Sequence, residues 1–199
     1  MFVGFGGVLR TLLVDSRLLP AVPSAARHLV ELKARYEDLG KARALLTGGE
    51  RLGSYRQVDT YFSLGERRMK VRIVEGHAGG ELVYYERPDV GGIKESLVIL
   101  ASLPDATAVV EILRRTFPVQ AEVRKTREIY RYHGIQIHLD TVPRLGKFVE
   151  FEKVLADESG QEAAKAELEA LRRYLQIPDE DLMASSYSDL LESRGRPPG

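Results

Sequence analysis

Residues 121–154, AEVRKTREIYRYHGIQIHLDTVPRLGKFVEFEKV, contain three consecutive segments in which polar and apolar residues alternate. We predict strands over 121–132, 135–141 and 147–154, because an alternation of period two is typical of strands with one buried face. The connections between these segments are short, which favours antiparallel neighbours joined by hairpins. This stretch therefore predicts a sheet built from successive antiparallel strands.

Strand-like segments also lie upstream of this stretch. They occur at 28–36, 57–63, 68–75, 81–87 and 94–100. Their connections carry glycines, at Gly65, Gly76, Gly79–Gly80 and Gly91–Gly92. Glycine in such positions is typical of hairpin turns. Seven or eight short strands joined in this way predict an antiparallel sheet that closes, or nearly closes, on itself.

Four other segments have helical patterns. Helices are predicted over 38–46, 105–116, 159–175 and about 178–191. Asp38 and Asp105 stand at the start of the first two segments, where an aspartate is a favourable N-cap. The predicted fold class is α+β, with helices flanking a closed antiparallel sheet.

The 199 residues suffice for one domain of ordinary size. We assign the domain to residues 23–192, an extension to residues 1–22 and a disordered tail to residues 193–199. The extension is apolar, but charged residues interrupt it before it reaches the length of a membrane span. It also lacks the basic start of a signal peptide. Two interpretations of residues 1–22 remain. The first is a tail, or residues translated from an upstream start codon, and the second is an additional strand or short helix packed on the domain.

The composition excludes several classes of protein. Lys and Arg total 29 and Asp and Glu total 29, so the bulk basic excess that nucleic-acid-binding proteins normally show is absent, although this zero sum does not say where the charges lie. The chain has no cysteine, which excludes disulfides, thiolate metal sites and cysteine nucleophiles. We therefore predict a cytoplasmic protein with neither a nucleic acid nor a membrane as partner.

Charged residues recur on one face of the predicted strands. The bases are Lys33, Arg35, Lys70, Arg72, Arg87, Lys125 and Arg127, and the acids are Glu31, Asp140, Glu150 and Glu152. For any one strand, a solvent-exposed face is the more common explanation of such a pattern. The alternative is that these faces point into a closed barrel and line a tunnel.

A tunnel lined in this way would have a definite chemistry. Its excess of three bases cannot be buried cheaply without compensating anions, and a chain of phosphates supplies several negative charges. The acids suit Mg²⁺ or Mn²⁺, which prefer oxygen ligands and often share phosphate oxygens.

Several of these stretches, taken in order, resemble the CYTH domain family, the triphosphate tunnel metalloenzymes. They are VELKAR (30–35), KVR (70–72), KTREIY (125–130), HLDTVPRLGKFVEFE (138–152) and the closing SYSDLL (186–191). The similarity covers about residues 28–191 and is greatest to the class IV adenylate cyclases. It implies an eight-stranded antiparallel barrel that holds a triphosphate on bases beside a divalent metal bound by carboxylates.

The resemblance also implies roles for individual residues. Glu31 and Lys33 match the second Glu and the Lys of the family's E-x-E-x-K signature. Arg72, Lys125 and Arg127 match its phosphate-binding bases, and Lys33 and Arg72 are the expected catalytic residues. Asp140 and Glu150 match its late metal ligands, and Glu152 matches an additional acid of some members. Arg87 falls near the family's mid-barrel Lys, whereas Lys70 and Arg35 are phosphate-binding candidates by strand periodicity.

Two positions need separate comment. The first Glu of the signature would fall at position 29, where this chain has Leu29, and leucine cannot bind a metal. His138 shares the face of Asp140, so it is either a tunnel residue or a partnered polar side chain near the barrel end.

These observations lead to two hypotheses. The first is a Mg²⁺- or Mn²⁺-dependent enzyme that cyclises ATP to cyclic AMP with loss of pyrophosphate, or that hydrolyses a nucleoside, organic or inorganic triphosphate. The second is a catalytically weak nucleotide- or polyphosphate-binding module, because Leu29 weakens the metal site. A homodimer is an assembly that the sequence allows. Replacing Lys125 or Arg127 by Ala is expected to weaken triphosphate binding and to leave the fold intact or more stable, since each substitution removes a crowded positive charge.

Overall fold

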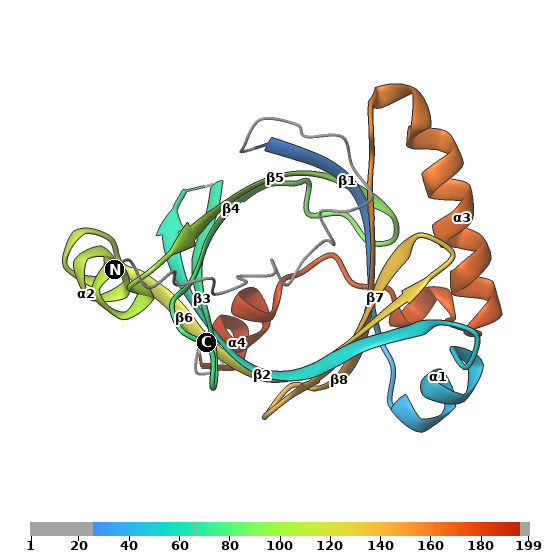
Figure 1. Ribbon diagram of the computed structural model, residues 1–199, viewed down its shortest axis with the longest axis horizontal. Helices are drawn as coiled ribbons and strands as arrows, with labels where there is room; N and C mark the ends of the chain where they lie inside the picture. Colours follow the sequence, from blue (N-terminus) through green and yellow to red (C-terminus); the bar gives the residue numbers. More distant parts are fainter. Residues whose placement is uncertain (1–25, 66, 196–199) are drawn as a thin grey trace, which may run out of the picture.

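The computed structural model describes residues 26–65 and 67–195, so the predicted extension over residues 1–22 lies outside the described residues. Its strands are β1 (Ala26–Arg35), β2 (Glu50–Leu64), β3 (Arg67–Val74), β4 (Gly80–Glu86), β5 (Lys94–Leu103), β6 (Val119–Tyr132), β7 (Ile135–Val142) and β8 (Gly146–Val154). They form a closed antiparallel barrel in the order β1-β5-β4-β3-β2-β6-β7-β8, as Figure 1 shows from one end. The predicted α+β fold with a closed antiparallel barrel is confirmed.

One strand is much longer than its pattern suggested. β2 begins at Glu50, seven residues before the predicted start, and its first half pairs with β6. Gly53 lies at a shift of register between the two strands and has a φ of +154°, near the extended region. The first half of β2 is mostly exposed, so it lacks the apolar alternation from which a strand is predicted.

For three helices, the predicted bounds agree with the observed ones to within a few residues. Asp38 caps α1 (Leu39–Leu45) by accepting a hydrogen bond from the Lys41 N–H at 2.9 Å. Asp105 does the same for α2 (Ala106–Thr116), accepting from the Ala108 N–H at 2.9 Å. α3 (Gln161–Tyr174) follows a short 3₁₀ turn.

The prediction of a helix over 178–191 is wrong in its first half. A 3₁₀ turn over Asp179–Asp181 is followed by an extended segment, and α4 (Tyr187–Gly195) starts only at Tyr187. The extended segment pairs with β1 through the Met183 N–H, which donates to the Lys33 carbonyl at 2.9 Å. This non-local pairing prevents the segment from forming its own helix. α4 also continues past residue 192, so residues 193–195 of the predicted tail are helical.

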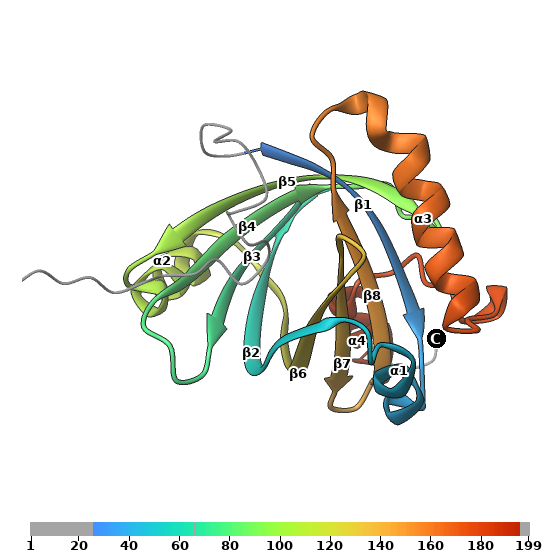
Figure 2. The same cartoon turned by 45° about the vertical axis from the view of Figure 1, so that its right-hand side comes forward.

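The apolar faces of the strands point away from the barrel axis and are covered by helices. Val30, Leu32 and Phe151 pack in one cluster with Leu168 and Leu171 of α3. Phe62 and Val71 pack with Ala106 of α2 on the other side. Figure 2 shows α3 lying along the β1 and β8 side of the barrel. The opposite faces, which carry the charges, therefore point inward.

Over 26–65 and 67–195, the structure contains no helix of the length and apolar character needed to cross a membrane.

Candidate functional site

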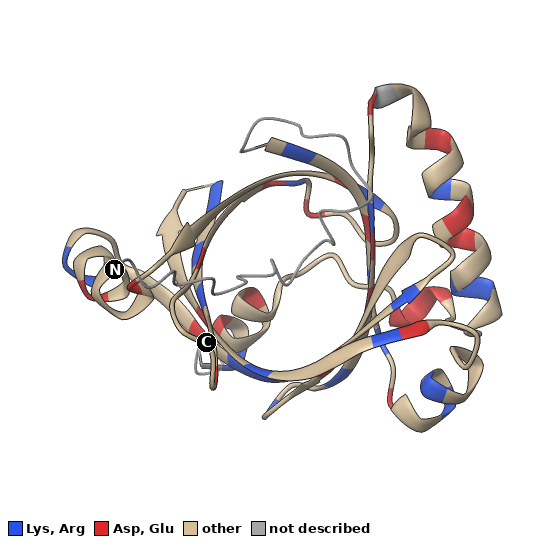
Figure 3. Ribbon diagram, viewed as in Figure 1, with Lys and Arg blue, Asp and Glu red and all other residues tan. Residues whose placement is uncertain are grey.

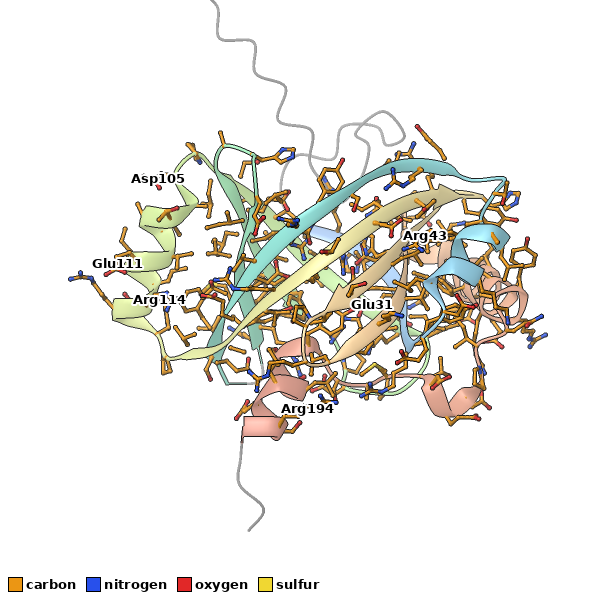
Figure 4. The ribbon with its side chains drawn as sticks, turned by 90° about the horizontal axis from the view of Figure 1, so that it is seen from below. Glu31, Arg43, Asp105, Glu111, Arg114 and Arg194 are labelled. Atoms are coloured by element: carbon orange, nitrogen blue, oxygen red, sulfur yellow. The ribbon has the colours of Figure 1, made fainter. Side chains whose placement is uncertain are left out.

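The barrel interior contains a cavity with charged walls. It holds about 740 Å³ of empty space, part of it open to solvent. The charged strands that surround it are visible in Figure 3, and in Figure 4 Glu31 lies over the middle of the strands, whereas Asp105, Glu111 and Arg114 lie at the α2 end. Nine of the predicted site residues line the cavity, namely Glu31, Lys33, Lys70, Arg72, Arg87, Lys125, Arg127, Glu150 and Glu152.

The other two predicted residues do not line this cavity. Arg35 lies over the Phe148 ring, with its guanidinium carbon 5.5 Å from the ring centroid. Asp140 is fully buried behind Arg127, from which its two oxygens accept hydrogen bonds at 2.7 and 2.6 Å. In this arrangement Asp140 positions Arg127.

Asp59 does not itself line the cavity: it is fully buried behind three of the bases that do, and it was not among the residues predicted from the sequence. Its carboxylate accepts hydrogen bonds from Arg72 at 2.8 and 3.0 Å and from Lys125 at 2.6 Å. The Lys70 ammonium lies 3.1 Å away. Asp59 shares a strand face with Gln57 and Tyr61, so the period-two rule applied to residues 57–63 would have found it.

This cluster of Asp59, Lys70, Arg72 and Lys125 has too little negative charge. Burial alone raises the pKa of Asp59, but Arg72, Lys125 and Lys70 together hold that pKa well below its usual range. Burial lowers the pKa of Lys125 well below its usual range, and the charges of Arg72 and Arg127 lower it further. One carboxylate thus faces three bases, and a bound anion would supply the missing charge.

Around Glu150 the charges are balanced. Its carboxylate pairs with the Lys33 ammonium at 3.0 Å and with Arg127 at 2.6 Å. Glu31 accepts a hydrogen bond from Arg87. These contacts explain why an inward cluster of bases and acids is tolerated in a buried site.

Glu152 is the acid without a basic partner. In the described part of the chain, no Lys or Arg lies within ion-pair distance of its carboxylate, and the nearest ring nitrogen, His138 Nδ1, is 3.7 Å away. Burial and the charges of Glu150 and Glu31 raise the pKa of Glu152 to about 8. A cation at this position would remove the repulsion.

Glu152, Glu150 and His138 could together hold such a cation. Each offers one ligand atom, and these atoms lie within 4.8 Å of one another. Burial and the charge of Arg127 lower the pKa of His138 to about 4, so its imidazole is neutral near pH 7 and can act as a ligand. Two carboxylates and one imidazole fit a divalent cation.

The C-terminal segment closes part of the same cavity. Tyr187, the first residue of α4, lines it, and its hydroxyl donates to Asp140 at 2.7 Å. The Lys33 ammonium lies 4.1 Å from the centroid of the Tyr187 ring. From the sequence, Tyr187 stands out only as part of the SYSDLL stretch (186–191).

We expect Glu152→Gln to weaken binding of Mn²⁺ by at least about tenfold, since it removes a charged ligand. The free energy of unfolding should stay unchanged or rise, because the amide replaces a carboxyl whose ionised form is disfavoured by burial. Calorimetric Mn²⁺ titration and urea unfolding measure the two effects. Glu122→Gln, on the exposed face of β6, is the matched control. Equal Mn²⁺ affinity in Glu152→Gln and the wild type would remove Glu152 from the metal site.

Comparisons with known proteins agree with this architecture. A family model described as CYTH domain matches residues 27–187. A protein of Methanocaldococcus jannaschii named "Putative adenylate cyclase MJ0240" is 25% identical over 169 residues, which is 81% of this chain and 97% of that protein.

Two solved structures from Pyrococcus horikoshii OT3 have the same fold. The PH1012 protein matches with a TM-score of 0.73 and 24% identity, over 81% of this chain and 98% of that one. The PH1819 protein matches with a TM-score of 0.69 and 26% identity, over 83% of this chain and 99% of that one.

Proposed function

This chain belongs to the CYTH domain family, and from that premise we propose that it is a divalent-metal-dependent enzyme acting on a triphosphate. The observation that carries the proposal is the opposite imbalance of charge within one cavity. Asp59, buried behind the cavity wall, faces three bases of that wall, whereas no Lys or Arg of residues 26–65 and 67–195 pairs with Glu152. A metal-bound triphosphate would supply negative charge to the bases around Asp59 and positive charge to Glu152.

In this proposal the bases divide the work. Lys70, Arg72 and Lys125 bind phosphate oxygens, and Arg127 is oriented for the same task by Asp140. Lys33 and Arg72 stabilise the charge that develops on the leaving phosphate, which is the main requirement of phosphoryl transfer. Arg87, paired with Glu31, contributes a further cation.

Glu150 and Glu152, with His138 and with Glu31 close by, would hold Mg²⁺ or Mn²⁺. The metal, when bound, neutralises charge on the phosphate oxygens. Glu150 also pairs with Lys33 and Arg127 and keeps both bases beside the metal ligands, so the bases and the metal ligands act on one substrate.

Among the reactions, we favour cyclisation of ATP, on the resemblance to class IV adenylate cyclases and the name of the M. jannaschii relative. The ribose 3′-oxygen attacks the α-phosphorus and loses its proton, the bond to the bridging oxygen breaks, and pyrophosphate leaves. Hydrolysis of the triphosphate by water is the competing reaction in the same site.

A specific observation favours a second function, a nucleotide-binding module with little catalysis. Leu29 is buried in the cavity wall, opposite Ser96 on β5 and Val154 on β8. Neither neighbour supplies the acid that position 29 lacks, so the metal is held by fewer carboxylates than in the family signature.

Turnover tests the proposal directly. The protein is incubated with ATP, GTP, CTP, UTP, thiamine triphosphate or tripolyphosphate and with Mg²⁺ or Mn²⁺. Cyclic nucleotide, pyrophosphate and phosphate are then measured. We expect cyclic AMP and pyrophosphate in equal amounts from ATP, whereas phosphate release would indicate hydrolysis.

Leu29→Glu tests the metal site. The added carboxylate should lower the Mg²⁺ or Mn²⁺ concentration that gives half-maximal turnover by about an order of magnitude. A wild type that is inactive beside an active Leu29→Glu would support the binding module. If neither turns over any triphosphate and Glu150→Gln leaves metal binding unchanged, the proposal of a metalloenzyme is wrong.

A further inference from the structure

One wall of the cavity is apolar, in contrast to the basic wall around Asp59. It is formed by side chains of β1, β4 and β5, namely Leu29, Val83, Tyr85, Val98 and Leu100. These five side chains belong to one cluster of apolar contacts. The strand register keeps them adjacent, because Tyr85 lies opposite Val98 and Val83 lies opposite Leu100. We call this set the apolar wall.

The apolar wall adjoins the basic cluster. The Lys70 ammonium lies 3.1 Å from the Asp59 carboxylate and 5.8 Å from the centroid of the Tyr85 ring. The basic cluster and the apolar wall therefore meet at Lys70, so a ligand whose phosphates bind the cluster places its next group against the wall.

Polar atoms without partners lie beside the apolar wall. Ser96 lines the cavity next to Leu29, and within the described part of the chain its buried Oγ makes no hydrogen bond. Arg87 pairs with Glu31 through Nη1, while its buried Nε and Nη2 find no acceptor in residues 26–65 and 67–195. The buried Nη1 of Arg27, at the same end of β1, likewise has no partner among the described residues. Buried donors without acceptors cost free energy, so these atoms suit a ligand that supplies acceptors.

Arg87 adds a flat surface to this arrangement. Its guanidinium carbon lies 5.5 Å from the centroid of the Tyr85 ring. Planar guanidinium and phenol groups are favourable stacking partners for a heteroaromatic ring. Acceptors on such a ring could pair with the free Arg87 donors and with Ser96.

We propose that the apolar wall binds the heteroaromatic group of an organic triphosphate, so that this cavity selects organic triphosphates over inorganic tripolyphosphate. The inference rests on the proposed function, because the phosphates must occupy the basic cluster of the same cavity. It gives Leu29 a positive role, since a glutamate there would put a charge into the apolar wall. Inorganic tripolyphosphate would leave the wall uncovered and the Ser96 and Arg87 donors unpaired.

Binding measured by calorimetry in EDTA, where turnover is suppressed, tests this inference. The ligands are ATP, GTP, CTP, thiamine triphosphate and tripolyphosphate at one salt concentration. We expect at least one organic triphosphate to bind the wild type more tightly than tripolyphosphate does, although tripolyphosphate carries more charge.

Two variants examine the apolar wall itself. Ser96→Ala removes an unpaired hydroxyl, so it should fold normally and weaken only the organic ligand, by about threefold to tenfold. Leu29→Ala should weaken the organic ligand by at least about tenfold. Neither should change tripolyphosphate binding. Ser102→Ala, at an exposed position of β5, is the matched control and should change nothing.

The outcomes separate this inference from the proposed function. If tripolyphosphate binds but Ser96→Ala weakens no ligand, or weakens every ligand equally, selection by the apolar wall is wrong and the triphosphate site stands. If tripolyphosphate binds more tightly than every organic ligand, the selection is also wrong. If no triphosphate binds, both the proposed function and this inference are wrong.

Discussion

Arg127→Met is expected to lower the free energy of unfolding by about 3–5 kcal/mol, the usual loss when one partner of a buried ion pair is removed. Arg127 donates two hydrogen bonds to Asp140 and one to Glu150, and all three side chains are buried. The substitution leaves Asp140 without its cation and Glu150 with Lys33 as its basic partner. The expectation from sequence, that removing Arg127 leaves the fold intact, is therefore revised.

Urea unfolding at pH 7 measures this loss, with Arg124→Met as the control. Arg124 is on the same strand, but its side chain is exposed, so its removal should change stability by less than about 0.5 kcal/mol. An Arg127→Met protein as stable as the control would show that Asp140 and Glu150 do not depend on Arg127.

Arg127→Met should also reverse the way in which the free energy of unfolding depends on pH. Burial raises the pKa values of Asp140 and Glu150, but nearby positive charges outweigh burial. The charge of Arg127 keeps the pKa of Asp140 below its usual 3.8, and the charges of Lys33 and Arg127 keep that of Glu150 below its usual 4.5. A carboxyl with a lowered folded-state pKa stabilises the fold above its unfolded pKa, and this stability is lost as the pH falls. In Arg127→Met the uncompensated, buried Asp140 has a raised pKa, so acidification from pH 7 toward pH 5 should recover part of the lost stability.

Asp59→Asn is expected to destabilise the protein by a similar amount, about 3–5 kcal/mol, because three bases then share no carboxylate. Unlike the stability lost in Arg127→Met, the stability lost in Asp59→Asn should be regained when an anion binds. Tripolyphosphate should bind Asp59→Asn at least about tenfold more tightly than it binds the wild type, since it no longer competes with Asp59 for the bases. Tripolyphosphate should therefore stabilise the folded Asp59→Asn protein more than it stabilises the folded wild type.

Thermal unfolding with and without tripolyphosphate, together with calorimetry, measures both effects. Asp89→Asn is the control, because it removes an exposed partner of Arg68 outside the basic cluster. A destabilised Asp59→Asn that gains nothing from tripolyphosphate would mean that the three bases do not form an anion site. That result would weaken the proposed function more than any change at the metal ligands.

Local features of the chain were readable from its sequence. The alternation in 121–154 predicted three strands, because a strand with one buried face repeats every two residues. Asp38 and Asp105 were predicted as caps, because a cap needs only the next few residues. The first half of β2 was not predicted because it lacks a buried face. Residues 178–186 were wrongly predicted as helix because part of this segment is held extended by β1.

The direction in which the charged faces point was decided only by the tertiary structure. Alternation shows that a strand has two different faces, but it does not say which face water contacts. Here the helices cover the apolar faces, and closure of the barrel encloses the charged ones. The resemblance to a known family pointed to this outcome, whereas the charge pattern of a single strand favoured the exposed alternative.

The sequence by itself determined the strands, two helix caps and nearly all of the charged residues that line the cavity. Only the tertiary structure decided which charges meet. Asp59 contacts Arg72, 13 positions away, and Lys125, 66 positions away, because the register of β2 against β3 and β6 brings them together. Strand register depends on pairing across the whole barrel. No local pattern could therefore show that Asp59 holds the bases, that Asp140 holds Arg127 or that Glu152 has no Lys or Arg partner among the residues that the structure describes.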